Sequence, residues 1–308
     1  MKHFLSCDWG TSAFRLRVLD ASGQLIEEVK SDQGISKVHQ DWVQNPEANK
    51  NKIQFYKSYL AKALHKLQIV LEPDSPIIIS GMASSSLGII ELPYGPLPFA
   101  LTTDVPAWHL LESDNQVPHP VYIVSGFKTN TDVMRGEETM LIGIDNLAED
   151  EICILPGTHS KHAYIKSGVL TDFITYVTGE LFSVMSQVSI LSNSMEKGED
   201  TNAFESGLDE AASGNLLNQF FKVRTRHLLN RTSGVSNYQF LSGLLIGTEL
   251  KELRNTACKI RLISEGPMTQ LYGHALGRMN LNVTVNSAPE ALINGHLKIL
   301  KGILTNRA

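Results

Sequence analysis

An acid, a glycine and two hydroxyl side chains interrupt two apolar runs in the stretch CDWGTSAFRLR, at residues 7–17. Gly10 lets the backbone approach a bulky anion, so the N–H groups of a tight turn can converge on phosphate oxygens. Thr11 and Ser12 add hydroxyl donors to such a turn. Asp8 is suited to hold Mg²⁺, directly or through water, because Mg²⁺ takes few carboxylates and keeps several waters. An ordinary hairpin turn is the alternative that this stretch alone leaves open.

A second stretch of the same chemistry, PGTHSKH at residues 156–162, also follows an apolar run. It begins with Gly157 and Thr158. Ser160 then adds a hydroxyl, and Lys161 adds a positive charge. Neither a Walker A nor a GxGxxG motif occurs in the chain, so the common nucleotide-binding sequences are absent. Two glycine–hydroxyl turns of this kind nevertheless suit the two sides of the phosphates of one nucleotide.

A charged cluster lies between the two turns, in TDVMRGEETMLIG. Glu137 and Glu138 open a predicted helix, where carboxylates also suit the helix dipole. One carboxylate of the cluster can accept the proton of a substrate hydroxyl, while Arg135 pairs with an anionic group of the substrate. The residues leave open whether Glu137, Glu138 or Asp132 takes that proton.

The composition excludes several other classes of protein. The chain has 308 residues, 42% of them hydrophobic, which is enough for two lobes that each have a core. Its net charge of −5 provides no broad basic surface and argues against nucleic acid as the main partner. Three widely spaced cysteines form no disulfide framework and fit a reducing cytoplasm. No apolar run reaches the roughly 18 residues of a membrane span, and FLSC at the start is too short for a secretory signal.

Short apolar runs alternate with helical patterns along the chain, which predicts an α/β protein of two lobes with a cleft. Strands are expected at 3–7, 14–19, 25–29, 76–81, 120–126, 152–155, 260–264 and 282–285, and a hairpin at 163–177. Helices are expected at 136–148, 179–190, 202–221, 238–255, 268–279 and 288–301. Another helix is expected to begin with Asn45 as its N-cap and Pro46 in its first position. Strand-rich segments near 1–30 and 150–178 indicate two related halves.

Four motifs in this order, VMRGEET, PGTHSKH, VTGEL and FLSGLLIG, resemble the 2-dehydro-3-deoxygalactonate kinases, within the sugar-kinase, actin and heat-shock-chaperone superfamily. The resemblance implies a two-lobed actin-like (ribonuclease H-like) ATPase fold with a nucleotide cleft between the lobes. Residues 1–150 would form the N-terminal lobe and 151–308 the C-terminal lobe, with the last helix packing back on the N-terminal lobe. The implied reaction uses ATP and Mg²⁺, and transfers the γ-phosphate to the terminal (6-) hydroxyl of 2-dehydro-3-deoxygalactonate.

The resemblance also implies roles for particular residues. The ATP-binding residues would be Gly10, Thr11, Ser12, Arg15, Gly157, Thr158, His159, Ser160, Lys161, Gly243 and Gly266. The catalytic carboxylate would be Glu137, with Glu138 and Asp132 as rivals, and Asp8 would be the metal-associated acid. The substrate side would include Gly81, Met82, Asp132 and Arg135, the last chosen because a fixed fork of donors suits a carboxylate.

Two departures from the family pattern bear on the substrate. Ser84 stands where a second glycine is usual in the stretch SGMASSSLGIIELPY, and Ile89 stands where tryptophan is usual. A kinase for a different sugar or sugar acid is therefore one alternative. The other is an actin-like ATP switch, against which the acid–arginine cluster argues. The expected partners are ATP and a small sugar acid, in the cytoplasm, and a homodimer is the commonest oligomer for such an enzyme.

Overall fold

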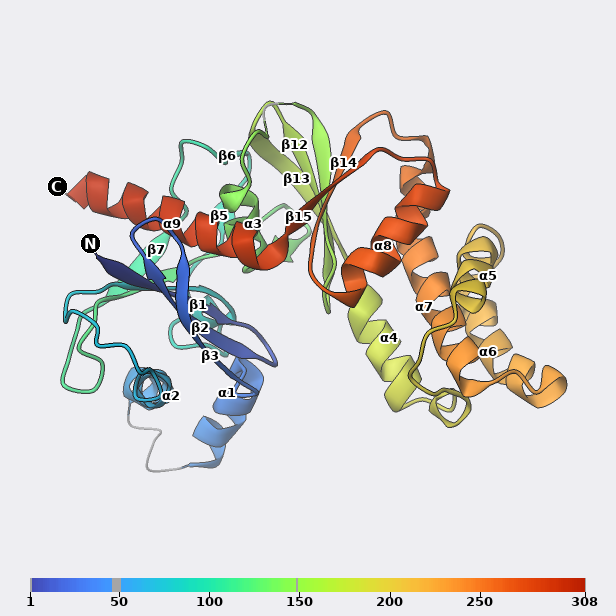
Figure 1. Ribbon diagram of the computed structural model, residues 1–308, viewed down its shortest axis with the longest axis horizontal. Coiled ribbons are helices and arrows are strands. Elements are labelled where there is room, and N and C mark those ends of the chain that lie inside the picture. The colour runs from blue at the N-terminus through green and yellow to red at the C-terminus, as the bar shows by residue number, and fades with distance from the viewer. Residues whose placement is uncertain (1, 46–50, 148, 308) are drawn as a thin grey trace. The chain divides into compact units, whose positions relative to one another are not determined.

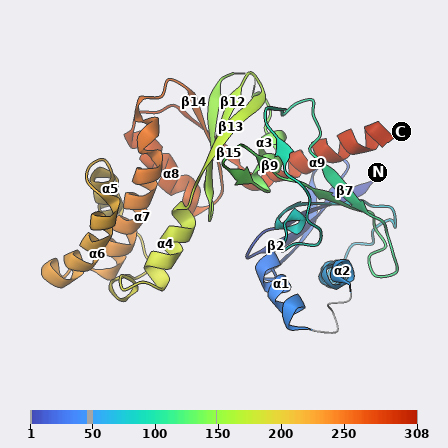
Figure 2. The same ribbon diagram turned by 180° about the vertical axis from the view of Figure 1, so that it is seen from behind.

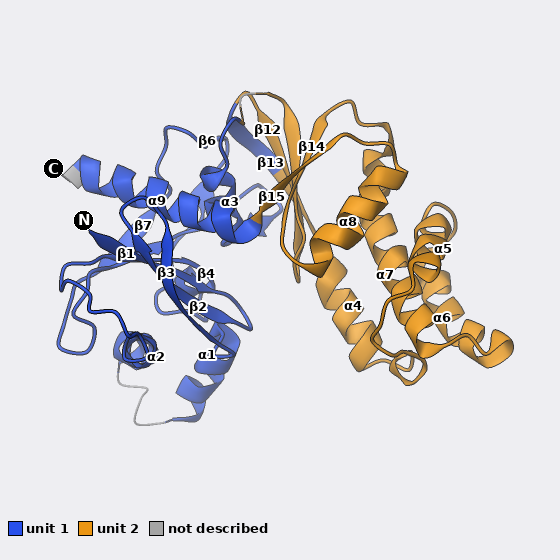
Figure 3. Cartoon of the chain, viewed as in Figure 1, with its two compact units in different colours: residues 1–146, 168–172, 288–308 blue, residues 147–167, 173–287 orange. Residues whose placement is uncertain are grey.

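The computed structural model describes residues 2–45, 51–147 and 149–307. The chain forms two compact units, which we call unit 1 and unit 2 (Figure 3). Unit 1 comprises Met1–Asn146, Gly168–Asp172 and Ala288–Ala308, and unit 2 comprises Leu147–Ser167 and Phe173–Ser287. Each unit is therefore made of more than one segment, whereas the sequence suggested a single division after residue 150.

Unit 1 is built on a six-stranded sheet with the order β3-β2-β1-β4-β8-β7. Its strands are β1 (His3–Trp9), β2 (Phe14–Asp20), β3 (Leu25–Ser31), β4 (Ile77–Gly81), β7 (Trp108–Leu111) and β8 (Val121–Val124). The first three form an antiparallel meander, and β4 and β8 extend the sheet in parallel with β1. A smaller sheet contains β5 (Gly95–Pro96), β9 (Phe127–Lys128) and β10 (Val133–Met134).

Unit 2 repeats this arrangement in its own sheet. The strands are β11 (Glu151–Leu155), β12 (Ser160–Lys166), β13 (Val169–Tyr176), β14 (Lys259–Ser264) and β15 (Val283–Ser287). Their order, β13-β12-β11-β14-β15, matches β3-β2-β1-β4-β8, again with an antiparallel hairpin and two parallel neighbours. β6 (Phe99–Ala100) pairs with the start of β13, which belongs to unit 1. The shared order confirms the two related halves that the sequence indicated.

The helices of unit 1 are α1 (Ile35–Gln44), α2 (Lys52–Leu64), α3 (Glu137–Gly143) and α9 (Ala288–Arg307). The prediction that Asn45 begins a helix is wrong, because Asn45 ends α1, a helix that the sequence analysis did not identify. α2 begins instead after Asn51, whose side chain accepts a hydrogen bond from the Gln54 N–H. Pro46 lies outside the described residues.

The two faces of the unit 1 sheet have different neighbours. Figures 1 and 2 show α1 and α2 on one face, and α9 with α3 on the other. Cys7 and Trp9 of β1 are fully buried in the core that includes α1 and α2. Ser6 faces the other way, where its hydroxyl bonds to Nδ1 of His296 on α9 at 2.7 Å. Because side chains alternate along a strand, Asp8 shares the face of Ser6, on the side of α9 and α3.

The last helix packs very closely against α3 within unit 1. A Cβ atom on Gly143 would lie 1.7 Å from the carbonyl oxygen of Ala291, and one on Gly295 would lie 1.9 Å from that of Thr139. Only glycine allows the two helix backbones to approach this closely. The C-terminal helix therefore helps to fix the short helix that begins with the two glutamates.

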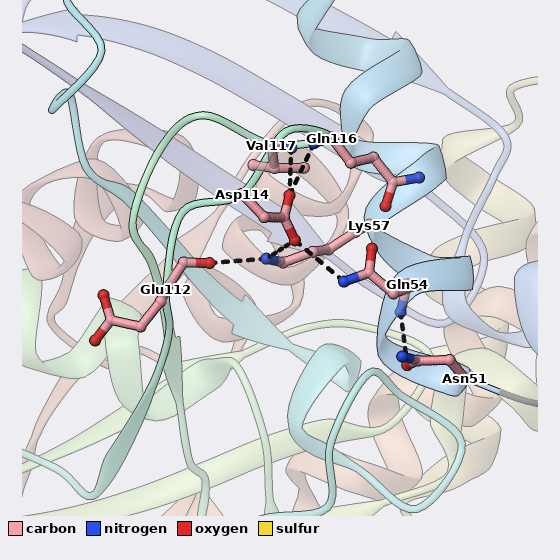
Figure 4. A network of polar contacts seen from close by, with 7 residues as sticks. All are labelled: Asn51, Gln54, Lys57, Glu112, Asp114, Gln116 and Val117. Carbon is pink, nitrogen blue, oxygen red and sulfur yellow. Dashed lines mark hydrogen bonds and ion pairs between the residues drawn. The ribbon is translucent and has the colours of Figure 1, made fainter.

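A buried lysine joins α2 to the segment after β7 (Figure 4). Lys57 Nζ donates to Oδ2 of Asp114 and to the carbonyl oxygen of Glu112, both at 2.8 Å. The other carboxylate oxygen of Asp114 accepts the backbone N–H groups of Gln116 and Val117. Burial alone would raise the pKa of Asp114, but these bonds, with Lys57 foremost, lower it well below its usual value. The network stabilises this side of unit 1.

The helices of unit 2 are α4 (Thr178–Gln187), α5 (Thr201–Ala211), α6 (Leu216–Asn230), α7 (Gly234–Leu250) and α8 (Pro267–Arg278). The single helix predicted over 202–221 is wrong in extent. Gly214, with a φ of 87°, breaks the chain there, and Asn215 caps a new helix by accepting the Leu217 N–H. No helix among the described residues is long and apolar enough to cross a membrane.

Candidate functional site

The first glycine–hydroxyl turn connects β1 to β2 in unit 1. The Gly10 N–H donates to the carbonyl oxygen of Ala13 at 2.9 Å and closes the turn. The turn's own carbonyl groups accept N–H groups from α1, Gly10 from Ile35 at 2.9 Å and Thr11 from Ser36 at 3.1 Å. A Cβ atom on Gly34 would lie 2.4 Å from the Thr11 carbonyl oxygen, so a glycine is required where α1 meets the turn. The turn is thus held by backbone contacts.

Two charged side chains lie at the strand ends beside this turn. Asp8 of β1 is paired with Arg15 of β2 in the antiparallel register, and Oδ2 of Asp8 lies 3.6 Å from Nη1 of Arg15. Both side chains keep about a third of their surface exposed, 32% and 35%. Thr11 and Ser12 are exposed as well. The turn therefore offers hydroxyl groups, a carboxylate and a guanidinium to a ligand from solvent.

The second turn connects β11 to β12 in unit 2 and is held in a similar way. The Glu180 N–H of α4 donates to the carbonyl oxygen of Thr158 at 2.9 Å. A Cβ atom on Gly179 would lie 2.3 Å from the carbonyl oxygen of Gly157, so glycine is again required where the helix meets the turn. Gly157 itself has a different reason to be glycine. Its Cβ would meet nothing within 4 Å, which leaves space beside the backbone for a bulky anion.

The residues after Thr158 are only partly available to a ligand. His159 is half exposed and its Nε2 lies 2.8 Å from Oε2 of Glu180. Ser160 and Lys161 are buried, and Lys161 Nζ donates to the carbonyl oxygen of His159 at 2.9 Å. The Ser160 hydroxyl donates to Glu249 at 2.7 Å inside the unit. Gly157, Thr158 and His159 are the exposed part of this turn.

The two later glycines predicted to bind ATP have different surroundings. Gly266 is exposed, with a φ of 59° and no atom within 4 Å of its Cβ position, directly before Pro267 begins α8. It therefore combines an unusual backbone conformation with open space. Gly243 lies inside α7, where its Cβ would come 2.0 Å from the carbonyl oxygen of Phe204 on α5. The packing of α5 against α7 accounts for this glycine.

Three elements of unit 1 meet at the edge where the acidic cluster lies. Gly81 ends β4 beside Trp9 of β1, and a Cβ on Gly81 would lie 2.9 Å from the Trp9 carbonyl oxygen. Gly136, directly before α3, would place its Cβ 3.3 Å from the Cα of Gly81. Both glycines have positive φ, 90° and 110°. The structure thereby brings together the residues that follow β1, the residues that follow β4 and the start of α3. Met82, half-buried, follows Gly81 in this group.

The two glutamates of α3 have different environments. Glu137 is half-buried and its Oε2 accepts the Arg135 N–H at 3.0 Å. Glu138 is fully buried, and accepts the Gly136 N–H at 2.6 Å and the Thr139 hydroxyl at 3.1 Å. Burial and the nearby charge of Glu137 raise the pKa of Glu138 to about 7. Glu137 is thus the one that a ligand in solvent can reach.

Arg135 is already engaged by the segment that follows β4. Its Nη1 donates to the carbonyl oxygen and the hydroxyl of Ser84, both at 2.6 Å. The guanidinium lies over the ring of Tyr94, 4.1 Å from the centroid, and Nη2 reaches the Leu92 carbonyl oxygen at 3.4 Å. Ile89 lies in the core of the unit, with 2% of its surface exposed. Arg135 therefore fastens residues 84–94 to the start of α3.

The remaining acid of the cluster lies in a turn before α3. The carboxylate of Asp132 accepts the Val133 N–H at 2.7 Å, in the hairpin between β9 and β10. Within the described part of the chain, no three His, Cys, Asp or Glu side chains gather as a metal-binding group. A single partly exposed carboxylate such as Asp8 still fits Mg²⁺, because this ion is commonly held by one or two carboxylates and by phosphate oxygens.

Two α/β units with the same strand order, each with a glycine–hydroxyl turn after its first strand, define an actin-like ATPase fold. A solved structure that shares this fold is an activator of 2-hydroxyisocaproyl-CoA dehydratase from Clostridium difficile with bound ADPNP. It has a TM-score of 0.50 and 12% identity, and the alignment covers 99% of this chain and 97% of that one. The predicted α/β class and two-lobed ATPase fold are thereby confirmed.

Within this class, residues 8–299 match the model of the 2-keto-3-deoxy-galactonokinase family, and the chain belongs to that family. It is 28% identical over 301 residues to the 2-dehydro-3-deoxygalactonokinase of Escherichia coli (strain K12), covering 95% of each chain. A crystal structure of a "putative 2-dehydro-3-deoxygalactonokinase" from Sinorhizobium meliloti has a TM-score of 0.85 and 28% identity, with 97% of this chain and 96% of that chain covered. The family predicted from the four motifs is therefore confirmed.

The residues that support the two turns give only weak signals in the sequence. Gly34 was not singled out, and Gly179 was noted only as part of VTGEL. Glu249 lies just after FLSGLLIG, and a lone acid near the end of an apolar helix resembles an ordinary solvent-facing residue. A glycine before an amphipathic pattern, as at Gly34 before Ile35 and Val38, is the signal that would have identified α1 and its contact.

Proposed function

We propose that this protein is an ATP-dependent kinase that phosphorylates the terminal hydroxyl of 2-dehydro-3-deoxygalactonate. The observation that carries the proposal is the family match over residues 8–299, together with a solvent-reachable carboxylate at the start of α3. An ATP switch needs no such substrate-directed acid, which favours the kinase. The reaction uses ATP and a small sugar acid, and we place it in the cytoplasm.

The two turns bind the phosphates of ATP in this proposal. In unit 1 the ligand groups are the backbone and hydroxyls of Thr11 and Ser12, with Arg15 as a nearby positive charge. In unit 2 the exposed Gly157, Thr158 and His159 contribute, while the buried Ser160 and Lys161 support the turn. Gly266 lets the chain approach the nucleoside, and Gly243 acts through the position of α7. Bound Mg²⁺ supplies charge neutralisation on the phosphate oxygens, and Asp8 is the residue that would hold it.

Glu137 is the proposed acceptor of the hydroxyl proton. Phosphoryl transfer asks a protein mainly for positioning and for charge stabilisation, so this carboxylate orients the hydroxyl as well as taking its proton. The bond from the Arg135 N–H holds one of its oxygens in place. Glu138, buried behind it with a raised pKa, fixes the Gly136 backbone rather than contacting the substrate.

The acceptor site is proposed to lie along residues 81–94 and the start of α3, with Gly81 and Met82 beside the bound sugar acid. Arg135 shapes this site by holding Ser84 and Tyr94. Direct recognition of the substrate carboxylate by Arg135 requires it to exchange one of these bonds. Asp132 contributes a further carboxylate near the same helix.

The test of the function is a coupled ADP-release assay with Mg²⁺-ATP over a panel of sugar acids and sugars, with a reaction lacking acceptor as the blank. Turnover on 2-dehydro-3-deoxygalactonate alone supports the proposal. Turnover on another acceptor keeps the kinase and changes its substrate. ATP binding without turnover on any acceptor contradicts the kinase and favours a switch. Light scattering of the same sample tests the homodimer, which we propose as the oligomeric state.

Replacing Glu137 with glutamine is expected to lower kcat by roughly 100-fold or more, because the hydroxyl loses its proton acceptor. The dissociation constant for ATP should change little, since the residue does not bind phosphate. Glu112→Gln, an exposed glutamate of the same unit, is the matched control and should retain full activity. Full activity of the Glu137 variant would move the proton acceptor to another residue.

A further inference from the structure

A buried carboxylate of unit 2 connects several elements around the second turn. Glu249, near the end of α7, has 1% of its side chain exposed. Four side chains surround it with donor groups: Ser160 Oγ at 2.7 Å, His162 Nε2 at 3.1 Å, Tyr272 OH at 2.7 Å and Thr178 Oγ1. The carboxylate therefore has hydrogen-bond partners on three elements, β12, α4 and α8.

Each donor belongs to an element next to the proposed ATP site. Ser160 begins β12 directly after the turn that contains Thr158. Thr178 is the first residue of α4, and the next two residues of α4 make the contacts with the turn. Tyr272 lies on α8, the helix that follows Gly266. One carboxylate thus links the end of the turn to the first residue of α4 and to Tyr272 inside α8.

Stability alone gives little reason for a carboxylate in this place. Taking a charge out of water is costly, and a well-packed apolar side chain serves a core as well or better. Burial would raise the pKa of Glu249, but the bonds from His162, Thr178 and Ser160 lower it below its usual value. The group is therefore kept ionised, and charge-assisted bonds to an ionised carboxylate are short and directional.

We propose that Glu249 is a positioning residue for ATP, which fixes the second turn against the N-terminus of α4 and against α8 before the nucleotide binds. The inference rests on the proposed function, because it takes the turn at 156–159 to be the one that binds phosphate. Glu249 does not contact ATP. It acts through Ser160 and Thr178, whose backbones shape the turn.

The main variant is Glu249→Gln, which keeps the size of the side chain and removes its charge. The matched control is Glu151→Gln. Glu151 is a second buried glutamate of unit 2, bonded to Arg261 Nε at 2.6 Å, at the end of β11 remote from the turn. Tyr272→Phe removes a single donor at nearly constant volume, and serves if the Glu249 variant does not fold.

Measurements of ATP binding, of acceptor kinetics, of hydrogen exchange and of the melting temperature separate positioning from plain stability. The dissociation constant for ATP and the KM for the sugar acid are measured for all four proteins. Hydrogen exchange of the amides at 157–160 is followed without nucleotide. Glu249→Gln should weaken ATP binding by about 10-fold, speed exchange in the turn and leave the KM for the acceptor within about 2-fold. Tyr272→Phe should show the same pattern at roughly 3-fold. Glu151→Gln should lower the melting temperature only.

A Glu249→Gln protein that loses stability like the Glu151 variant, with unchanged ATP affinity and turn exchange, would overturn the positioning role. Unchanged ATP affinity in a folded Tyr272→Phe protein would overturn it as well. A wild-type protein that binds ATP without phosphorylating the sugar acid contradicts the proposed function alone, because the nucleotide measurements still test Glu249. A wild-type protein that does not bind ATP overturns both.

Discussion

The two glycine–hydroxyl turns, one in each unit, are built on the same plan. Each joins two antiparallel strands, and the first strand of each pair also has a parallel neighbour, β4 for β1 and β14 for β11. A helix then donates N–H groups to the carbonyls of the turn. At each meeting point a glycine, Gly34 or Gly179, allows the contact. The likeness of the two halves therefore lies in backbone contacts more than in side chains.

The surroundings of the two turns differ in their charged groups. Beside the first turn, Asp8 and Arg15 keep about a third of their side chains exposed. Beside the second, an exposed carboxylate, Glu180, pairs with His159, and another carboxylate, Glu249, is buried and bonded to Ser160. The second turn therefore has, besides exposed charged groups, a buried carboxylate that holds the shape of the turn.

The largest effect is expected where helix and turn meet. Gly179→Ala places a Cβ atom 2.3 Å from the Gly157 carbonyl oxygen, so the turn or the helix must move. A shift of about 1 Å at a phosphate-binding turn is expected to lower kcat/KM for ATP by roughly 100-fold. Gly34→Ala makes the same overlap with Thr11 at 2.4 Å and should cost activity to a similar degree. Steady-state kinetics at varied ATP gives both values.

A helical glycine with free space is the control for these variants. Gly273 on α8 has no atom within 4 Å of its Cβ position, so Gly273→Ala should keep full activity and raise stability by about 0.5–1 kcal/mol. Normal activity of the Gly179 variant would show that the second turn tolerates displacement. In that case the common plan of the two turns would carry no functional meaning.

Much of this architecture could be predicted from local patterns. The hairpin between β12 and β13 turns at Ser167 and Gly168, which both have positive φ, as the Ser-Gly pair predicts. Pro267 occupies the first turn of α8, where its fixed φ suits a helix start. Both glycine–hydroxyl turns lie at strand ends. These features depend on residues close together in the sequence, and a single sequence displays them directly.

Contacts between distant residues could not be predicted in the same way. Arg135 bonds to Ser84, and Glu249 bonds to Ser160, across 51 and 89 positions respectively. A charged residue has the same appearance in the sequence whether it meets a ligand or a carbonyl group of its own chain. Arg135 was expected on the substrate because of its chemistry, and the fold shows it holding residues 84–94. Only the fold decides where such a side chain is used.

Each sheet also has a buried polar anchor near its turn, and the two anchors should respond differently to acid. His296 of α9 lies between the hydroxyls of Ser6 at 2.7 Å and Ser80 at 3.0 Å. Burial, with a smaller effect of Arg17, lowers the pKa of His296 to about 3. The pKa of Glu249 is lowered, so its carboxyl group stays ionised at any pH above the ordinary pKa range of a carboxyl group. Mild acid should therefore lower the stability that His296 contributes to unit 1, while Glu249 stays ionised.

The sign of the expected change follows from the protons bound in each state. An unfolded histidine takes up a proton below about pH 6.5, whereas the folded His296 does not, so the free energy of unfolding falls with falling pH. Between pH 7.5 and pH 5 the difference between wild type and His296→Gln should shrink by about 2 kcal/mol. Urea unfolding of both proteins at each pH measures this difference in the free energy of unfolding. The pKa of His119 is also lowered by burial, but both proteins share that effect, so the difference removes it. A constant difference over this range would contradict a neutral, buried His296.

The smallest effect is expected when a single hydroxyl group is removed from one of the turns. Thr158→Val keeps the branched shape of the side chain and removes one donor from the exposed part of the second turn. A hydrogen bond to a charged group is worth roughly 1.5–3 kcal/mol, and the lower end applies to this exposed turn, so ATP affinity should fall by about 10-fold. Isothermal titration calorimetry with ATP measures this change directly.

Thr11→Val is the matching change in the first turn. Comparing the ATP affinities of the two variants shows whether both turns bind the phosphates. Losses of similar size in both variants support two equivalent phosphate contacts. Unchanged ATP affinity in the Thr158 variant would remove the second turn from the ATP site, and the common plan of Gly34 and Gly179 would then reflect only the shared origin of the two halves. A loss at Thr158 alone would assign phosphate binding to the turn that Glu249 supports, and leave the exposed charges of Asp8 and Arg15 as the contribution of the first.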